Sequence, residues 1–236
     1  MQLKSHRKER PMMTAFLIYL FNVFLVGGHM DTKHIHWLGH SAFRIEDKGK
    51  QIYIDPFKLP VNLPKADIIF ITHSHYDHFS PEDITKIRTE KTILVAPKNT
   101  AAQFHGNIIA VEPGKSYEVG TIKVITVPAY NINKKFHPKG NGWVGYIITL
   151  SNGERIYHSG DTDFIPEMKK IVADVAMMPC GGTYTMTATE MAEAANTFKP
   201  KLLIPMHWGS IVGSKTDAET VKKLFKGETE IMTVEE

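Results

Sequence analysis

The chain has one cysteine, Cys180, among its 236 residues. A single thiol forms no disulfide within the chain and builds no Cys-rich zinc ribbon, so both of these frameworks are excluded. The chain also has no large excess of charge of one sign, because its 28 Lys and Arg and its 25 Asp and Glu give a net charge of only +3. So small an excess does not indicate nucleic acid as a partner, and we expect none.

Long hydrophobic runs are missing as well. The longest, at 12–26, is shorter than the ~20 residues that cross a bilayer. It follows a basic stretch between Lys4 and Arg10, and this layout is typical of an export signal. A misassigned start, with the folded protein beginning at Met30, and a cloning remnant at Gly-His-Met are alternatives. The protein is expected to be cytoplasmic if Met30 is the true start, and exported or membrane-anchored if residues 1–29 are a signal segment. Membrane contact is expected only if residues 12–26 are retained.

The remaining composition is that of an ordinary globular protein, with 42% hydrophobic and 22% charged residues. We therefore expect residues 1–29 to lie outside the fold and residues 30–236 to form one α/β domain. Apolar and β-branched runs bounded by turn residues predict strands. These runs are His34–Glu46, Gln51–Ile54, Asp67–Thr72, Thr92–Ala96, Ile108–Val111, Thr121–Val127, Trp143–Leu150, Arg155–His158, Asp174–Met178 and Lys201–Pro205.

Capping signals predict three helices between and after these strands. Ser80-Pro81 is an N-cap followed by a proline at the first helical position. Thr187 and Glu190 form a capping box ahead of Met191–Phe198, and a last helix is predicted at Ser214–Lys226.

Histidine is the residue that the chain has in excess, at twelve, and several of these side chains gather in Phe70–Phe79. His73 and His75 follow a predicted strand and project to the same side if the extended backbone continues. Asp77 and His78 then point elsewhere as the chain turns, so the two pairs can serve two adjacent cations. Imidazole and carboxylate suit zinc, and also iron or manganese.

Two later predicted strands also end at metal-ligand side chains. Asp161 follows Arg155–His158, with Gly160 allowing the backbone to turn. His207 follows Lys201–Pro205 in the same way. A carboxylate shared by two cations offsets their repulsion, so Asp161 can bridge a dinuclear site.

From Met30 to the C-terminus these residues resemble the metallo-β-lactamase superfamily. Within it, the WLGHSAF, IDPF and HWG segments at 37–43, 54–57 and 207–209 are similar to uncharacterised metal-dependent hydrolases related to ascorbate-6-phosphate lactonase. The resemblance implies a four-layer αββα sandwich with the metals at one edge of its two sheets.

The resemblance also implies two divalent metal ions, with zinc the first choice and manganese or iron the alternatives. By motif, His73 and His75 bind the first metal and Asp161 bridges. The second metal would be held by Asp77, His78 and His207.

One ligand position departs from the superfamily pattern. The superfamily has a histidine directly after the strand that here ends at Val127-Pro-Ala-Tyr130. This sequence has Asn131 at that position, and the nearest imidazole is His137. Either the loop folds back so that His137 completes the first site, which we predict, or His137 lies on the substrate rim.

Three further residues are expected to support the site. His40 and Asp55 are predicted to contact the ligands or the substrate, Asp55 by orienting an imidazole. Tyr184 is a candidate substrate donor. Lys134, Lys135 and Lys139 are either solvated charges or attract an anionic substrate.

The ligand set predicts a metal-dependent hydrolase in which a metal-bound hydroxide attacks a small, anionic lactone, ester or amide, with Asp77 accepting the proton of the nucleophile. The chain lacks a GxSxG nucleophile elbow, and a mechanism with a metal-bound hydroxide needs no serine nucleophile. A phosphodiesterase or nuclease of the same superfamily and a non-catalytic metal-binding protein are the alternatives.

Overall fold

The structure is a computed structural model that describes residues 30–235. The alternatives for residues 1–29, and with them the predicted export or membrane contact, lie outside the described residues. Within 30–235, none of the helices combines the length and the hydropathy needed to cross a bilayer.

The first half of the described chain forms a six-stranded sheet in simple sequence order. Its first three strands pair antiparallel, and the remaining pairs are parallel. The strands are β1 (Ile35–Gly39), β2 (Ala42–Asp47), β3 (Lys50–Ile54), β4 (Ile68–Phe70), β5 (Ile93–Pro97) and β6 (Ile108–Val111).

The second half forms a seven-stranded sheet, again in sequence order. Its first four strands pair antiparallel, and its last four pair parallel. The strands are β7 (Ser116–Val119), β8 (Ile122–Pro128), β9 (Val144–Thr149), β10 (Arg155–His158), β11 (Val175–Pro179), β12 (Leu202–Met206) and β13 (Glu228–Thr229).

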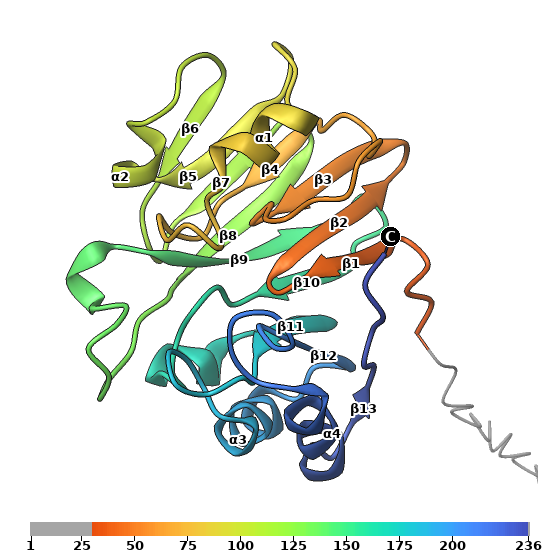
Figure 1. The fold of residues 1–236 in the computed structure, drawn as a ribbon, viewed down its shortest axis with the longest axis vertical. Helices are drawn as coiled ribbons and strands as arrows, with labels where there is room; N and C mark the ends of the chain where they lie inside the picture. The colour runs from red at the N-terminus through yellow and green to blue at the C-terminus, as the bar shows by residue number, and fades with distance from the viewer. Residues whose placement is uncertain (1–29, 236) are drawn as a thin grey trace, which may run out of the picture.

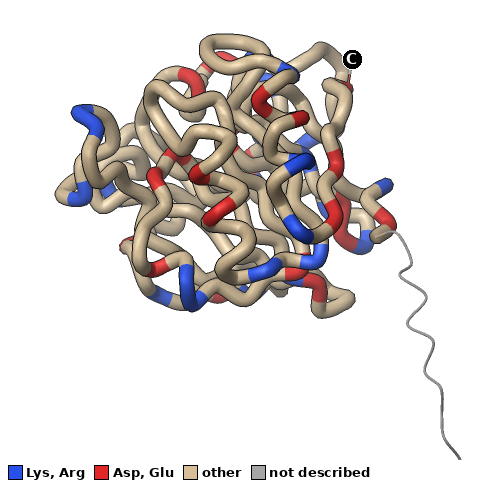
Figure 2. Tube along the Cα trace, turned by 90° about the horizontal axis from the view of Figure 1, so that it is seen from below, with Lys and Arg blue, Asp and Glu red and all other residues tan. Residues whose placement is uncertain are grey.

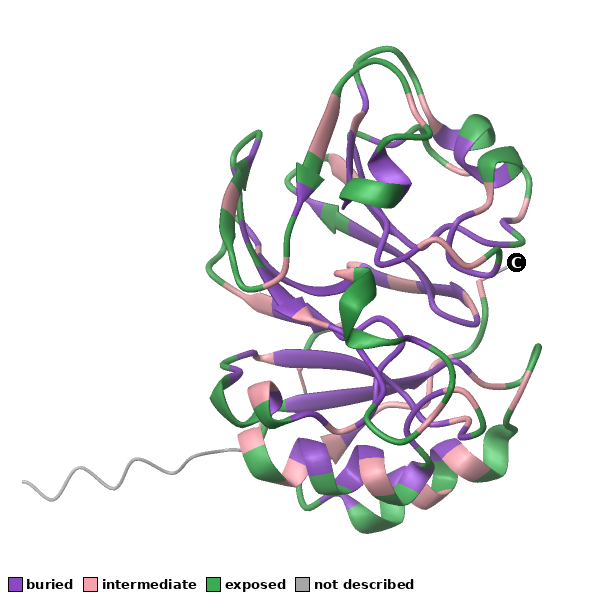
Figure 3. Ribbon diagram, turned by 90° about the vertical axis from the view of Figure 1, so that its left-hand side faces the viewer, coloured by how far each residue is buried: buried purple, intermediate pink, exposed green. Residues whose placement is uncertain are grey.

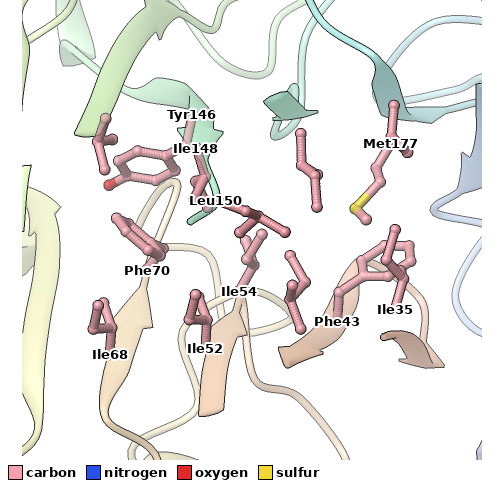
Figure 4. Close-up of a cluster of buried hydrophobic side chains, with 14 of the residues drawn as sticks. Ile35, Phe43, Ile52, Ile54, Ile68, Phe70, Tyr146, Ile148, Leu150 and Met177 are labelled. Carbon is pink, nitrogen blue, oxygen red and sulfur yellow. The ribbon is translucent and has the colours of Figure 1, made fainter. Parts of the chain in front are cut away.

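The main hydrophobic core lies between the two sheets. Alternate residues of each strand point inward, so that Ile52, Ile54 and Phe70 of the first sheet face Tyr146 and the other core residues of the second (Figure 4). Two sheets packed face to face bury one side of each, and each outer face must then be covered by another layer.

Helices provide those outer layers. On one side lie α1 (Pro81–Ile87) and α2 (Lys98–Ala101), and on the opposite side lie α3 (Ala188–Phe198) and α4 (Lys215–Leu224), as Figure 1 shows. Each side has its own apolar cluster under the helices. Figure 3 shows buried residues filling the strands while α3 and α4 expose their outer faces. The predicted four-layer αββα sandwich is therefore confirmed.

The predicted helix starts agree with the structure. Ser80 accepts a hydrogen bond from the backbone N–H of Asp83, and Thr187 and Glu190 form the expected capping box. Two short 3-10 helices, η1 (Lys139–Asn141) and η2 (Pro166–Lys170), and the short elements β7, β13 and α2 were not predicted.

The prediction of one continuous strand at His34–Glu46 is wrong. Gly39 and His40 have φ values of 101° and 52°, in the left-handed region, and they reverse the chain. The result is an antiparallel hairpin of β1 and β2, which places His40 at its tip.

Candidate metal centre

The candidate ligands lie at the ends of strands from both sheets. His73, His75, Asp77 and His78 follow β4, whereas Asp161 follows β10. His207 follows β12, and His137 lies in the loop between β8 and β9. The fold thus brings together side chains that are more than 130 residues apart in the sequence.

Three of the imidazoles form a first cluster, called here the loop group: His73, His75 and His137. Each offers a nitrogen within 4.8 Å of the others. His73 Nε2 lies 3.2 Å from His75 Nδ1, and the His75 and His137 ring centroids are 4.7 Å apart. The prediction that His137 folds back toward His73 and His75 agrees with this geometry.

A second cluster, called here the buried group, comprises His40, Asp77, His78 and His207. All four are buried, and their ligand atoms lie within 4.8 Å of one another. His78 Nε2 and His207 Nε2 lie 3.8 and 3.9 Å from Asp77 Oδ2. The three residues predicted as ligands of a second metal are therefore together, with His40 beside them.

Asp161 lies between the two groups and is 3% exposed. Its Oδ2 is 3.2 Å from His137 Nε2 in the loop group and 3.1 Å from His207 Nε2 in the buried group. Its Oδ1 is 3.2 Å from His78 Nε2. Asp161 is therefore the residue that contacts both groups.

At this point imidazole nitrogens lie 3.1–3.2 Å from the Asp161 oxygens, yet several of these buried polar atoms form no hydrogen bond of good geometry with any described residue. They are His78 Nε2, His137 Nε2, His207 Nε2 and Asp161 Oδ1. Buried polar atoms without a partner are costly, and a cluster of imidazole nitrogens around a carboxylate is a donor set that suits zinc, iron or manganese. The residues present therefore fit divalent cations.

Gly160 allows the strand that carries Asp161 to approach the strand that carries the histidine motif. Its φ is 61°, and a Cβ at this position would lie 2.9 Å from the Cβ of Thr72. Any other residue would push Asp161 away from His73.

Hydrogen bonds to Asp55 fix which nitrogen of two imidazoles faces the centre. The fully buried Asp55 carboxylate can only accept, so His78 Nδ1–H donates to it over 2.7 Å, and this turns Nε2 toward the centre. Thr72 Oγ1 also donates to Asp55, over 2.6 Å, and its lone pair faces His73 Nδ1 at 2.9 Å. His73 Nδ1 thus carries the proton, and its Nε2 is free to bind a cation.

Sequence reasoning predicted that Asp55 orients an imidazole, and the contact with His78 has this geometry. It missed Thr72, which links the same carboxylate to His73. The signal available in the sequence was a Thr directly before the first histidine at a strand end, where its hydroxyl and its backbone N–H can both reach a neighbouring carboxylate.

His40 has the equivalent role toward Asp77. His40 Nε2 donates to Asp77 Oδ2 over 3.0 Å. Burial would raise the pKa of Asp77, but the hydrogen bond from His40 and the nearby His78 outweigh it and lower the pKa to about 2. Asp77 is therefore ionised at neutral pH, as a ligand must be.

Burial lowers the pKa of His73 well below its usual value, so this imidazole is neutral and able to bind a cation. Burial also acts to lower the pKa of His78, but the negative charges of Asp161 and Asp55 outweigh this effect and raise the pKa. A proton therefore competes with a cation at His78, and cation binding there releases it.

Asn131 is not part of either cluster, although the superfamily pattern places a ligand at this position. Its Nδ2 donates to the backbone oxygen of Tyr184 over 2.7 Å and lies 3.2 Å from His137 Nδ1. Its backbone N–H donates to the His137 carbonyl over 2.8 Å. Asn131 thus closes the loop that returns His137 to the centre.

Asp163 anchors the same loop from the side of β10. It accepts from the backbone N–H of Ile132 over 2.9 Å and forms an ion pair with Lys134. His137 itself has a φ of 56°, in the left-handed region that side chains disfavour. Asn131 and Asp163 hold the loop in which this backbone conformation occurs.

Two residues of the loop group, His75 and His137, and two of the buried group, Asp77 and His207, line a cavity of about 260 Å³ that opens to the surface. Tyr184, which was predicted to contact substrate, lines it, together with residues that sequence reasoning did not single out: Tyr76, Phe136 and Ile211. The sequence signal for Tyr76 and Phe136 was their position directly beside candidate ligands.

Two of the three lysines of the loop are paired with acidic side chains. Lys134 pairs with Asp163, and Lys139 lies 3.1 Å from a carboxylate oxygen of Glu167. Lys135 is exposed and lies outside the cavity lining. Figure 2 shows basic and acidic residues interspersed over the described chain.

The comparisons with known proteins identify the family of the chain. A family model described as "Beta-lactamase superfamily domain" matches residues 34–207. A UPF0173 metal-dependent hydrolase of Nanoarchaeum equitans is 35% identical over 202 residues, which cover 80% of this chain and 90% of that protein. A second UPF0173 metal-dependent hydrolase, from Methanosphaera stadtmanae, is 31% identical, and the match covers 82% of this chain and 92% of that protein.

A solved structure has the same fold. The crystal structure of a candidate metal-dependent hydrolase from Parabacteroides distasonis superposes with a TM-score of 0.77 at 32% identity, and it covers 85% of this chain and 93% of that one. The chain belongs to the beta-lactamase superfamily and, within it, to the UPF0173 metal-dependent hydrolases.

Proposed function

We propose that the protein hydrolyses a small lactone, ester or amide at a dinuclear centre. His73, His75 and His137 would hold one cation, Asp77, His78 and His207 the other, and Asp161 both. The observation that carries the proposal is the set of unpartnered buried atoms from both groups that converge on Asp161 beside an open cavity. Zinc is the first choice for both ions because the donor set is mainly imidazole.

Two divalent cations, when bound, supply a water of lowered pKa and polarise the scissile carbonyl. Asp77 lines the cavity and is ionised, so its carboxylate can accept a proton from an attacking water. His40 fixes the orientation of Asp77 through the 3.0 Å hydrogen bond.

The donor set also fits a phosphodiesterase centre, but the cavity lining favours a carbonyl substrate. Among the described residues, those that line the cavity include neither Lys nor Arg. Phosphodiester substrates carry a charge that basic side chains commonly neutralise.

The experiment is metal analysis followed by a substrate panel. Protein loaded with zinc should contain two ions per chain and hydrolyse at least one neutral lactone or aryl ester, and chelation should abolish turnover. Manganese and iron are loaded in parallel. A protein that binds no metal, or whose hydrolysis is unaffected by chelation, would contradict the proposal.

A further inference from the structure

The rim of the cavity consists of four large apolar side chains, each from a different loop. Tyr76 comes from the loop before α1, Phe136 from the loop before β9, Tyr184 from the loop after β11, and Ile211 from the loop after β12. Tyr76 is 67% exposed, Phe136 46% and Ile211 37%. Single exposed apolar residues are ordinary, but four around one opening form a patch of the kind that binds a ligand.

From this rim we infer that the substrate is neutral and carries an apolar, aromatic or aliphatic, group beside its scissile carbonyl; the inference rests on the proposed function. It replaces the expectation of an anionic substrate. That expectation depended on the lysines of the loop, and two of these are paired with Asp163 and Glu167.

The rim is built into the same segments as the candidate ligands. Tyr76 lies between His75 and Asp77 in sequence, and Phe136 directly precedes His137. A group bound at the rim is therefore next to the two groups of ligands, and the carbonyl it carries can lie between them. This proximity makes the rim a part of the substrate site and not a separate surface.

Contacts between the rim residues hold the aromatic surface in place. The rings of Phe136 and Tyr184 meet edge to face, with centroids 4.8 Å apart and planes at 89°. Asn131 Nδ2 donates to the Tyr184 carbonyl and so connects this turn to the loop that carries Phe136. On the other side, Tyr76 packs edge-on against the buried Phe57 at 5.9 Å. Such rings present apolar faces and edges that favour another ring or an acyl chain.

Charge at the cavity argues in the same direction. The ionised groups that line it are the acids Asp77 and Asp161, and the described lining residues include no Lys or Arg. When both carboxylates are engaged with the cations, a negative charge at the outer end of a substrate meets Phe136, Ile211 and the rings of two tyrosines at the rim, but no Lys or Arg. Placing that charge on the rim costs desolvation without a compensating partner.

The test compares two p-nitrophenyl esters of equal acyl chain length, the hexanoate and the mono-adipate, which differ in a terminal methyl or carboxylate. The zinc-loaded protein should show a kcat/KM for the hexanoate about tenfold above that for the adipate. Phe136→Ala should lower the hexanoate value about fivefold, mainly through KM, at unchanged zinc content. Phe136→Leu should retain most of it.

Ile132→Ala is the matched control, because Ile132 is 53% exposed on the same loop but does not line the cavity. It should leave both esters unaffected. Equal or better turnover of the adipate, or equal effects of Phe136→Ala and Ile132→Ala, would overturn the inference. A change of oligomeric mass in Phe136→Ala without a kinetic change would overturn it too, since the rim would then be an interface.

Failure of the proposed function is recognised separately. If chelation does not affect ester hydrolysis, the proposed function is wrong, and the rim is then tested by calorimetric titration with the neutral aryl ketone benzylacetone. Wild type and Ile132→Ala should bind it with equal affinity and Phe136→Ala several-fold more weakly. No binding, or equal binding by all three, would overturn the inference.

Discussion

The loop group and the buried group differ in how their side chains are held. In the buried group, His78 is fixed by Asp55 and Asp77 by His40, and these partners follow strands of the first sheet. In the loop group, His137 comes from the segment between β8 and β9, which is held by Asn131 and Asp163. The buried group is thus held by partners at strand ends, whereas the loop group depends for one of its three ligands, His137, on a loop.

The difference indicates which site is preorganised. Hydrogen-bonded partners that fix the ring orientation raise metal affinity. His78 has such a partner in a fully buried carboxylate. His75, in contrast, is half-buried, and His137 depends on a backbone in the left-handed region. We therefore expect the buried group to bind a cation more tightly than the loop group.

The largest effect is expected where the groups meet. Asp161→Asn replaces the carboxylate that lies 3.1–3.2 Å from His78, His137 and His207. Metal content should fall below one ion per chain and turnover by about a hundredfold or more, because the charge offsetting two cations is halved. Glu219→Gln, the same change on an exposed residue, is the control. Wild-type metal content in Asp161→Asn would refute a shared ligand.

Removing the partner of the buried group tests whether that group is preorganised. Asp55→Ala leaves the N–H and O–H of Thr72 and the Nδ1–H of His78 without an acceptor. We expect the free energy of unfolding to fall by about 3–5 kcal/mol and the affinity of the buried-group cation by about 10–100-fold. Denaturant titration and competitive metal titration measure the two effects. An unchanged stability would show that this carboxylate is dispensable.

The metal-free protein should also lose stability in mild acid through His40. Burial lowers the pKa of His40 to about 4, against 6.5 for the unfolded side chain. The unfolded chain therefore binds more protons between these values, and stability present above pH 6.5 is lost as the pH falls toward 4, by about 3 kcal/mol. Burial of His73 and His158 acts in the same direction, and His78, whose pKa is raised, opposes it.

Thermal unfolding of metal-free wild type and His40→Gln between pH 7 and pH 4.5 measures this effect. The variant should show a flatter dependence on pH. Parallel curves for the two proteins would mean that His40 makes no such contribution.

The smallest expected effect is a change in the affinity for one cation alone. Asn131→Ala removes the Nδ2 contacts to His137 and to the Tyr184 carbonyl. The affinity of the loop-group cation should fall about tenfold, while the buried-group cation is unaffected. Asn133→Ala, at an exposed position of the same loop, is the control. Equal weakening of both cations would contradict the separation of the groups.

The sequence predicted the fold and the clustering of the candidate ligands well, because both depend on local patterns. Apolar runs located the main strands, and His73, His75, Asp161 and His207 were found because each follows a strand end. These features need no knowledge of distant partners. The relation to ascorbate-6-phosphate lactonase stays a prediction, as do the roles of the individual ligands.

The features that the sequence did not predict depend on contacts between distant segments, and a single sequence does not display such contacts. The pairing of Lys134 with Asp163, and of Lys139 with Glu167, neutralises lysines that the sequence left available for an anion. The role of Asn131 likewise depends on Tyr184, which is 53 residues away. The hairpin at His40 was missed because left-handed backbone at a non-glycine residue has no strong sequence signal.

The most direct test of the dinuclear account is a crystal structure of the zinc-loaded protein with anomalous differences measured on both sides of the zinc edge. The account predicts two zinc peaks per chain. One should lie ~2.0–2.2 Å from ring nitrogens of His73, His75 and His137, the other at bonding distance from Asp77, His78 and His207, with Asp161 touching both. A single peak, or a first zinc bound by Asn131 while His137 points to solvent, would contradict it.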